Sequence, residues 1–263
     1  MTSLSRVTVF LTAALSLCVC GAAQAKSHLS RDELKVLSNA TVAVVYMDSD
    51  RAVWPYIDRH SGTTPMSMAL ADDLNERQYQ NFLARVTPYQ GTLDRLSLPD
   101  SNRKAVQDAL ASVSFLHEAP WVTVVPDPKD HLFMREQGLK TKANVVIFIR
   151  PRLELNDDAD GLYMVTLIDI ETLDATGTTL QHYESAEVST DVDVDDDKLP
   201  PVAGSPAPGT GEEDIRAARL FADDGAGFKP FYFQLLKQAQ QKLYYFFTGE
   251  DTPPPPAAAA AAK

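Results

Sequence analysis

The sequence has 263 residues and a formal net charge of −12, because 36 Asp and Glu residues outnumber 24 Lys and Arg residues. This negative charge argues against binding to nucleic acid or to anionic lipid head groups. The length suits one large or two small domains, and no internal repeat is visible in the sequence.

Residues 1–25 have the pattern of a cleavable secretory signal peptide. Arg6 supplies a positive charge, an apolar stretch covers residues 7–19, and Ala23-Gln24-Ala25 is a small-residue cleavage pattern. The apolar stretch is shorter than the roughly 20 residues that a membrane-spanning helix needs. We therefore expect an exported protein, periplasmic or alternatively secreted, whose mature chain does not insert stably into a membrane.

Both cysteines, Cys18 and Cys20, lie inside the predicted signal peptide. The mature chain is therefore expected to contain no disulfide, so that its stability depends on an ordinary hydrophobic core. Large residues, Leu17 and Val19, precede the two cysteines. This argues against lipid anchoring, which needs a small residue at that position.

Strands and helices alternate in the first half of the mature chain. A β-branched apolar run predicts a buried strand over 41–47. Apolar residues at helical spacing predict a helix over 79–86, closed by Pro88, and another over about 101–116. A short strand over 121–125 and a helix from 128 to a stop at Gly138 are expected next.

Three consecutive strands with short turns are predicted over 145–155, 162–170 and 178–188. The uninterrupted apolar run at 145–149 indicates a strand covered on both faces. Pro151 lacks an amide donor and indicates a bulge or a sheet edge. The mixed polar pattern of 178–188 is typical of an exposed outer strand.

Residues 190–211 are rich in Asp, Pro and Gly, so we predict a disordered acidic insertion there. Helices are expected over 212–222 and, with many aromatic residues, over 230–247. Residues 249–263 are predicted to be a disordered Pro/Ala tail. Residues 26–248 would then form a single α/β domain, a two- or three-layer sandwich with a mixed sheet of about five strands and helices packed on it.

This order resembles the envelope domain shared by the amino-terminal part of TolB, the curli secretion protein CsgG and the outer-membrane activators of penicillin-binding proteins. The similarity covers about 41–189 and rests on two motifs, Ala-Asn-Val-Val-Ile at 143–147 and Leu-Ile-Asp-Ile-Glu-Thr at 167–172. Asn144 stands where the family has an aspartate. The resemblance implies a non-catalytic interaction domain of the cell envelope and transfers no functional residues.

Acidic residues and histidines are the candidates for metal ligands or catalytic groups. Residues 191–197 start like a calcium loop, but Asp196 and Val202 occupy the positions where that loop needs glycine and glutamate. The acidic turn over 156–160 could hold a cation, although hairpin turns favour these residues anyway. The five histidines show no zinc-ligand spacing. His60, Ser61 and Asp58 are hydrolase residue types that loop polarity explains equally well.

Large aromatic residues follow the first strand in a predicted loop. Trp54 and Tyr56 are flanked by Arg51 and Arg59, and exposed aromatics with neighbouring charge are favoured contacts for a protein partner. Alternatively, the two rings fold back onto the domain and cover a helix end.

The sequence therefore predicts a non-catalytic, periplasmic protein-interaction domain that needs no cofactor and binds another envelope protein. The outer strand at 178–188 is a second predicted contact region. Two alternatives are kept: a hydrolase of envelope polymers that uses carboxylates, and a weak calcium-binding module built on 191–197.

Overall fold

The computed structural model describes residues 27–49, 51–57, 65–125, 131–174, 178–201 and 210–251, with side chains omitted at 65–70 and 131–134. The predicted signal peptide, Arg59, the centre of the predicted insertion at 202–209 and the tail from residue 252 lie outside this part of the chain.

The fold is α/β, with helices packed on a mixed sheet, as the sequence predicts; the described sheet has six strands where about five are predicted. The strand order is β3-β1-β4-β5-β6, and β2 also pairs with β4. The strand β1 (Val42–Met47) is buried along its whole length, and it runs parallel to β3 (Trp121–Val124) and to β4 (Val145–Leu155). The short β2 (Trp54–Pro55), which the sequence did not predict, is parallel to the end of β4.

The predicted antiparallel meander is formed by β4, β5 (Gly161–Leu173) and β6 (Leu180–Asp193). Its register is continuous except for a shift opposite Ile170 and Glu171. The expectation for Pro151 is confirmed, because β1 pairs with β4 only as far as Ile149 and β2 begins at Glu154. The alternation of β4 turns the backbone of Pro151 toward this gap between β1 and β2, so its missing amide hydrogen costs no ladder hydrogen bond.

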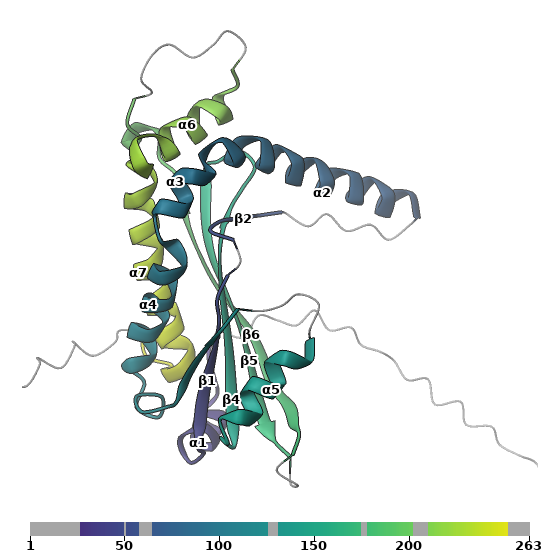
Figure 1. Ribbon diagram of the computed structural model, residues 1–263, viewed down its shortest axis with the longest axis vertical. Coiled ribbons are helices and arrows are strands. Elements are labelled where there is room, and N and C mark those ends of the chain that lie inside the picture. Colours follow the sequence, from purple (N-terminus) through teal and green to yellow (C-terminus); the bar gives the residue numbers. More distant parts are fainter. Residues whose placement is uncertain are drawn as a thin grey trace, which may run out of the picture.

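One face of the sheet is covered by α4 (Leu98–Ala111) and α7 (Phe228–Thr248), as Figure 1 shows. The expectation that the aromatic carboxy-terminal helix packs on the sheet is confirmed. Burying these rings removes a large apolar area from water, which stabilises the packed arrangement. The buried α7 side chains are Phe228, Phe231, Tyr232, Leu235, Leu236, Leu243, Tyr244, Phe246 and Phe247.

The helix α5 (His131–Lys140) lies on the opposite face, over the lower part of the sheet in Figure 1. The sequence predicts that this helix stops at Gly138, but Gly138 lies within it. A Cβ atom there would meet Leu180, Phe148 and Val146 side chains at 2.9, 3.1 and 3.2 Å. Glycine is therefore needed because the helix approaches the sheet closely.

Several elements near the amino terminus differ from the prediction. The helix α1 (Arg31–Ser38) was not predicted, although Ser30 and Glu33 form a capping box at its start. The helix predicted over 79–86 is the last part of the longer α2 (Pro65–Val86). After it, the chain continues through a 3₁₀ turn at Thr87–Tyr89 into α3 (Gln90–Arg95).

The prediction of disorder over the whole of 190–211 is wrong for its described parts. β6 extends to Asp193, a 3₁₀ turn covers Asp196–Lys198, and Val192, Val194 and Leu199 are buried. The predicted helix at 212–222 is α6 (Glu212–Gly225), whose backbone departs from helical geometry at residues 222–224.

Arg219 of α6 explains why the end of this segment is ordered. Its guanidinium donates hydrogen bonds to the carbonyl oxygens of Asp196, Leu199 and Pro200 at 2.6, 2.6 and 2.9 Å. Arg216 forms a two-pronged ion pair with the Asp196 carboxylate, both at 3.0 Å. The composition of the segment does not reveal these contacts, because the arginines that make them lie beyond it in the sequence.

Candidate binding surface on the sheet

The sheet face opposite α4 and α7 is only partly covered by the described elements. α5 packs over its lower part, while α2 projects away from its upper part (Figure 1). We call the uncovered region the open face. It consists of the side chains of Arg150, Arg152 and Glu154 on β4, Tyr163, Val165, Leu167 and Asp169 on β5, and Ser185, Glu187, Ser189, Asp191 and Asp193 on β6.

Trp54 lies at the border of the open face, beside two arginines. The Arg51 and Arg152 guanidinium groups are 4.9 and 5.1 Å from the centre of its indole ring. Trp54 Nε1 donates a 2.8 Å hydrogen bond to Ser49 Oγ, which fixes the ring on the loop that precedes β2. Cations this close to an indole ring are attracted to its π electrons.

Tyr56 stacks on Tyr163 of β5, with ring centres 4.0 Å apart and planes within 11°. The Tyr56 amide also donates a 2.8 Å hydrogen bond to the Leu155 carbonyl. Burial raises the pKa of Tyr163, and its neighbours Tyr56 and Asp160 raise it further. The two stacked rings lie beside Trp54, Arg51 and Arg152, which we call the Trp54 cluster.

The structure brings together three of the four predicted contact residues: Arg51, Trp54 and Tyr56. Arg59 lies outside the described residues. Trp54 and Tyr56 are half-buried against the sheet, so they both cover the domain and keep part of each ring accessible. Arg152 and Tyr163 are not among the residues predicted from the sequence, although strand alternation in 145–155 and 162–170 places both on the less buried face.

Charge on the open face is divided between its strands. Arg150 and Arg152 lie on β4, whereas Glu187, Asp191 and Asp193 lie on the outer strand β6. Burial and the nearby Arg152 lower the pKa of Arg150, while Asp169 acts in the opposite direction. The arginines of the open face therefore lie in the middle of the sheet, together with the acidic Glu154 and Asp169, whereas the charged residues of its β6 part are all acidic.

A cleft of about 240 Å³ lies between the loop before β2 and the helices α2 and α3. Its floor is apolar and its rim is polar; the lining residues are Arg51, Ala52, Val53, Phe82, Leu83, Val86, Thr87, Gln90 and Asp94. This lining includes one carboxylate and no histidine. The pair of acidic residues with a histidine that the hydrolase alternative requires is therefore not assembled in this cleft.

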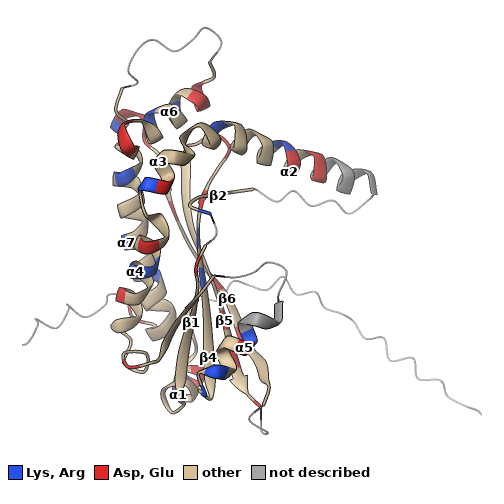
Figure 2. Cartoon of the chain, viewed as in Figure 1, with Lys and Arg blue, Asp and Glu red and all other residues tan. Residues whose placement is uncertain are grey.

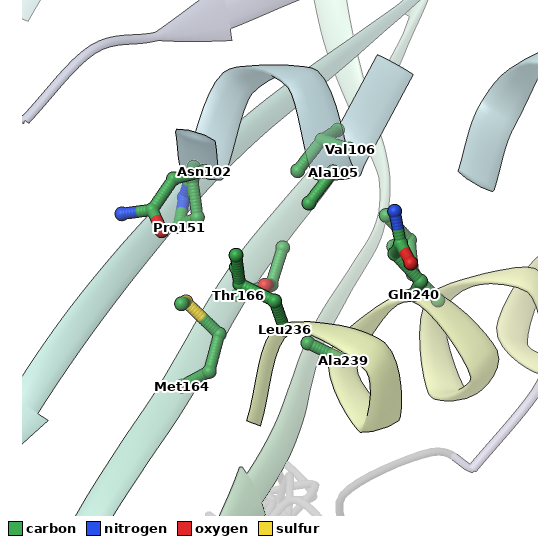
Figure 3. Close-up of a pocket in the computed structure, with 10 residues that line it drawn as sticks. Asn102, Ala105, Val106, Pro151, Met164, Thr166, Leu236, Ala239 and Gln240 are labelled. Atoms are coloured by element: carbon green, nitrogen blue, oxygen red, sulfur yellow. The ribbon is translucent and has the colours of Figure 1, made fainter. Parts of the chain in front are cut away.

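A second cavity lies between α4, α7 and the sheet, as Figure 3 shows. Its volume is about 10 Å³, and its lining combines apolar side chains with Asn102, Thr166 and Gln240. A space of this size is about that of one water molecule. It is therefore a small packing gap and not a site for a substrate.

Two carboxylates of the proposed calcium loop are already paired with basic side chains. Asp191 and Asp193 belong to β6, Asp195 pairs with Lys198 at 3.0 Å, and Asp196 pairs with Arg216. The Arg216 hydrogen bond lowers the pKa of Asp196. Within the described ranges, no group of three or more His, Cys, Asp or Glu side chains is placed to hold a metal ion.

The acidic turn at 156–160 is likewise organised by its own hydrogen bonds. Asn156 Oδ1 accepts hydrogen bonds from the amides of Asp160 and Gly161 at 3.0 and 3.1 Å. These hydrogen bonds are those of a tight hairpin turn, so the hairpin explanation accounts for the geometry of residues 156–160.

Among the histidines with described side chains, His28, His117 and His182 are exposed and lie in different parts of the chain.

No helix in the part of the chain that the structure describes combines the length and the apolar character needed to cross a bilayer. No protein-family model matches the chain, and no curated protein matches it.

Two solved structures are distantly similar. The hypothetical protein CT253 from Chlamydia trachomatis is 7% identical with a TM-score of 0.29, over 79% of this chain and 99% of that one. A candidate lipoprotein from Caulobacter crescentus CB15 is 18% identical with a TM-score of 0.17, over 56% of this chain and 99% of that one. At these TM-scores, neither similarity supports an argument about fold or function.

Proposed function

We propose that this protein is a non-catalytic interaction domain of the bacterial cell envelope, which binds another envelope protein through the open face. The observation that carries the proposal is that the Trp54 cluster and the Tyr56–Tyr163 stack lie on a sheet surface that α5 leaves uncovered and that α2 borders at Arg51. Aromatic and arginine side chains are enriched among the residues that contribute most to protein–protein binding.

The amino-terminal sequence supports the cellular location in this proposal. Its charge, apolar stretch and cleavage pattern are those of an export signal. The resemblance to envelope interaction domains, which rests on the motifs at 143–147 and 167–172, points to the same compartment and the same kind of activity.

The rigid arrangement of Trp54 favours binding over a purely solvated surface. Its indole is held by a hydrogen bond and by two arginines, so a partner can contact the aromatic and cationic groups with little loss of side-chain entropy. The half-buried apolar residues Val165 and Leu167 extend the same surface along β5.

Photo-crosslinking in intact cells tests the proposal. A photo-reactive phenylalanine derivative replaces Tyr56 on the open face, and in a matched control it replaces Phe233, an aromatic on α7 that is 59% exposed. We expect the derivative at residue 56 to form an adduct with one discrete envelope protein, and the derivative at residue 233 to form none. No adduct from residue 56, in cells where the protein is exported and folded, would refute the proposal.

A further inference from the structure

The two edge strands of the sheet differ in how many backbone N–H and C=O groups they present for pairing with another strand. The edge strand β3 contains only Trp121–Val124, and prolines precede and follow it at positions 120 and 126. Proline has no amide hydrogen, so this edge is poorly suited to pairing with another strand. β6 covers Leu180–Asp193 without proline, and in the described part of the chain it pairs only with β5.

The register shows which backbone groups of β6 point away from the sheet. The Val194 amide donates a 2.7 Å hydrogen bond to the Asp160 carbonyl, so even-numbered residues along this stretch face β5. In an antiparallel pair the alternate residues direct both their N–H and C=O groups outward. These residues are Ser185, Glu187, Ser189, Asp191 and Asp193.

An independent contact agrees with this alternation. Lys242 of α7 donates a 2.7 Å hydrogen bond from Nζ to the Ser189 carbonyl, one of the oxygens that the register directs outward. A lysine at a sheet edge is a common protection against unwanted strand pairing. Because the Lys242 side chain is exposed, it can leave this oxygen when another strand arrives.

The side chains along this edge have different character on the two faces. Glu187, Asp191 and Asp193 are exposed on the open face, and β6 contains no Lys or Arg. On the helix-covered face, Ala186 and Val188 are half-buried beside the core. A strand added here would place alternate side chains beside carboxylates and beside apolar groups.

A second copy of this chain does not fit the edge. Antiparallel pairing of two β6 strands would bring acidic side chains of one copy next to acidic side chains of the other. Like charges on neighbouring strands are destabilising. The charge pattern therefore favours a different partner and disfavours self-association through β6.

We infer that β6 accepts an extended peptide segment as an additional strand, and that this segment alternates Lys or Arg with apolar residues. The inference names the class of partner for the proposed function and rests on it. Backbone hydrogen bonds along β6 hold the peptide, and the carboxylates of Glu187, Asp191 and Asp193 select its basic side chains.

A short peptide of alternating Lys and Val tests the inference in a fluorescence titration with the folded protein. We expect saturable binding. A Glu–Val peptide, and a Lys–Val peptide N-methylated on the edge that pairs, should not bind. The triple variant Glu187→Gln, Asp191→Asn, Asp193→Asn should weaken binding about tenfold, since each exposed ion pair contributes modestly.

A matched control variant also removes three negative charges, but at positions on α2 that lie away from the β6 edge. The substitutions are Asp72→Asn, Asp73→Asn and Glu76→Gln on α2, which projects from the sheet and carries these acidic residues in the half farther from it (Figure 2). This variant should bind the Lys–Val peptide as the unmodified protein does. Equal weakening by both triple variants would overturn the inference, because it would show attraction by net charge alone.

Two further outcomes separate this inference from the proposed function. If the N-methylated peptide binds as well as the unmodified one, or no Lys–Val peptide binds, strand addition is refuted, while an adduct at residue 56 would still support the interaction domain. If the Lys–Val peptide binds at β6 but residue 56 gives no adduct in cells, strand addition is supported and the open-face function is refuted.

Discussion

At the scale of single residues, the buried tyrosines Tyr46 and Tyr232 contribute to how stability responds to alkaline pH. Their side chains are 1% and 2% exposed, and burial raises the pKa of each phenol above its ordinary value. The unfolded chain loses these protons near pH 10, whereas the folded chain keeps them. Their contribution to stability is therefore complete below about pH 10 and is lost as the pH rises above it.

We expect the free energy of unfolding to fall above about pH 10, by about 1.4 kcal/mol per pH unit for each tyrosine. Urea unfolding at a series of alkaline pH values measures this slope. Tyr232→Phe removes one of the two groups and should reduce the slope by about 1.4 kcal/mol per pH unit. A slope that is the same in the variant would contradict this account.

At the scale of elements, Arg219 joins α6 to the segment after β6. It donates to three carbonyl oxygens, and its side chain is 22% exposed. Arg219→Ala should destabilise the protein by about 2 kcal/mol, because these carbonyls lose charge-assisted hydrogen bonds. Hydrogen exchange should also become faster over 195–201. Arg95→Ala, which breaks an exposed ion pair with Asp224, should change stability by less than about 1 kcal/mol.

The junction between α6 and α7 depends on Gly227. A Cβ atom at this position would lie 2.3 Å from the Arg219 carbonyl oxygen, and backbone cannot move aside as a flexible side chain can. We expect Gly227→Ala to lower the free energy of unfolding by about 1–3 kcal/mol. Gly91→Ala on α3 is the control, because its Cβ would meet only Arg95 at an ordinary 3.8 Å. That change should be neutral or stabilising, and equal losses would refute the steric explanation.

At the scale of the whole molecule, stability depends on α7 covering the sheet. Phe246 is fully buried, whereas Phe233 on the same helix is 59% exposed. Phe246→Ala should therefore cost about 3–5 kcal/mol, and Phe233→Ala less than about 0.5 kcal/mol. Chemical denaturation of both variants measures the difference. Similar losses at the two positions would show that α7 does not stabilise the sheet as described.

Much of the fold could be predicted because its elements have strong local patterns. The buried run at 145–149, the turns of the meander and the aromatic helix each reveal their structure within a short stretch of sequence. The prediction failed where the deciding contact is distant. Polar composition suggested disorder at 190–201, but Arg216 and Arg219 bind this segment from α6.

The candidate surface likewise combines features that local sequence predicts with features that distant contacts decide. The sequence by itself determined the types of residue near Trp54 and the alternation of β4 and β5, because side-chain direction follows from local backbone geometry. Only the tertiary structure decided that Arg152 contacts Trp54, that Tyr163 stacks on Tyr56, and that this side of the sheet is left partly uncovered by the described helices. Such contacts join residues far apart in the chain, so they depend on how the packed elements meet and not on the pattern within any one element.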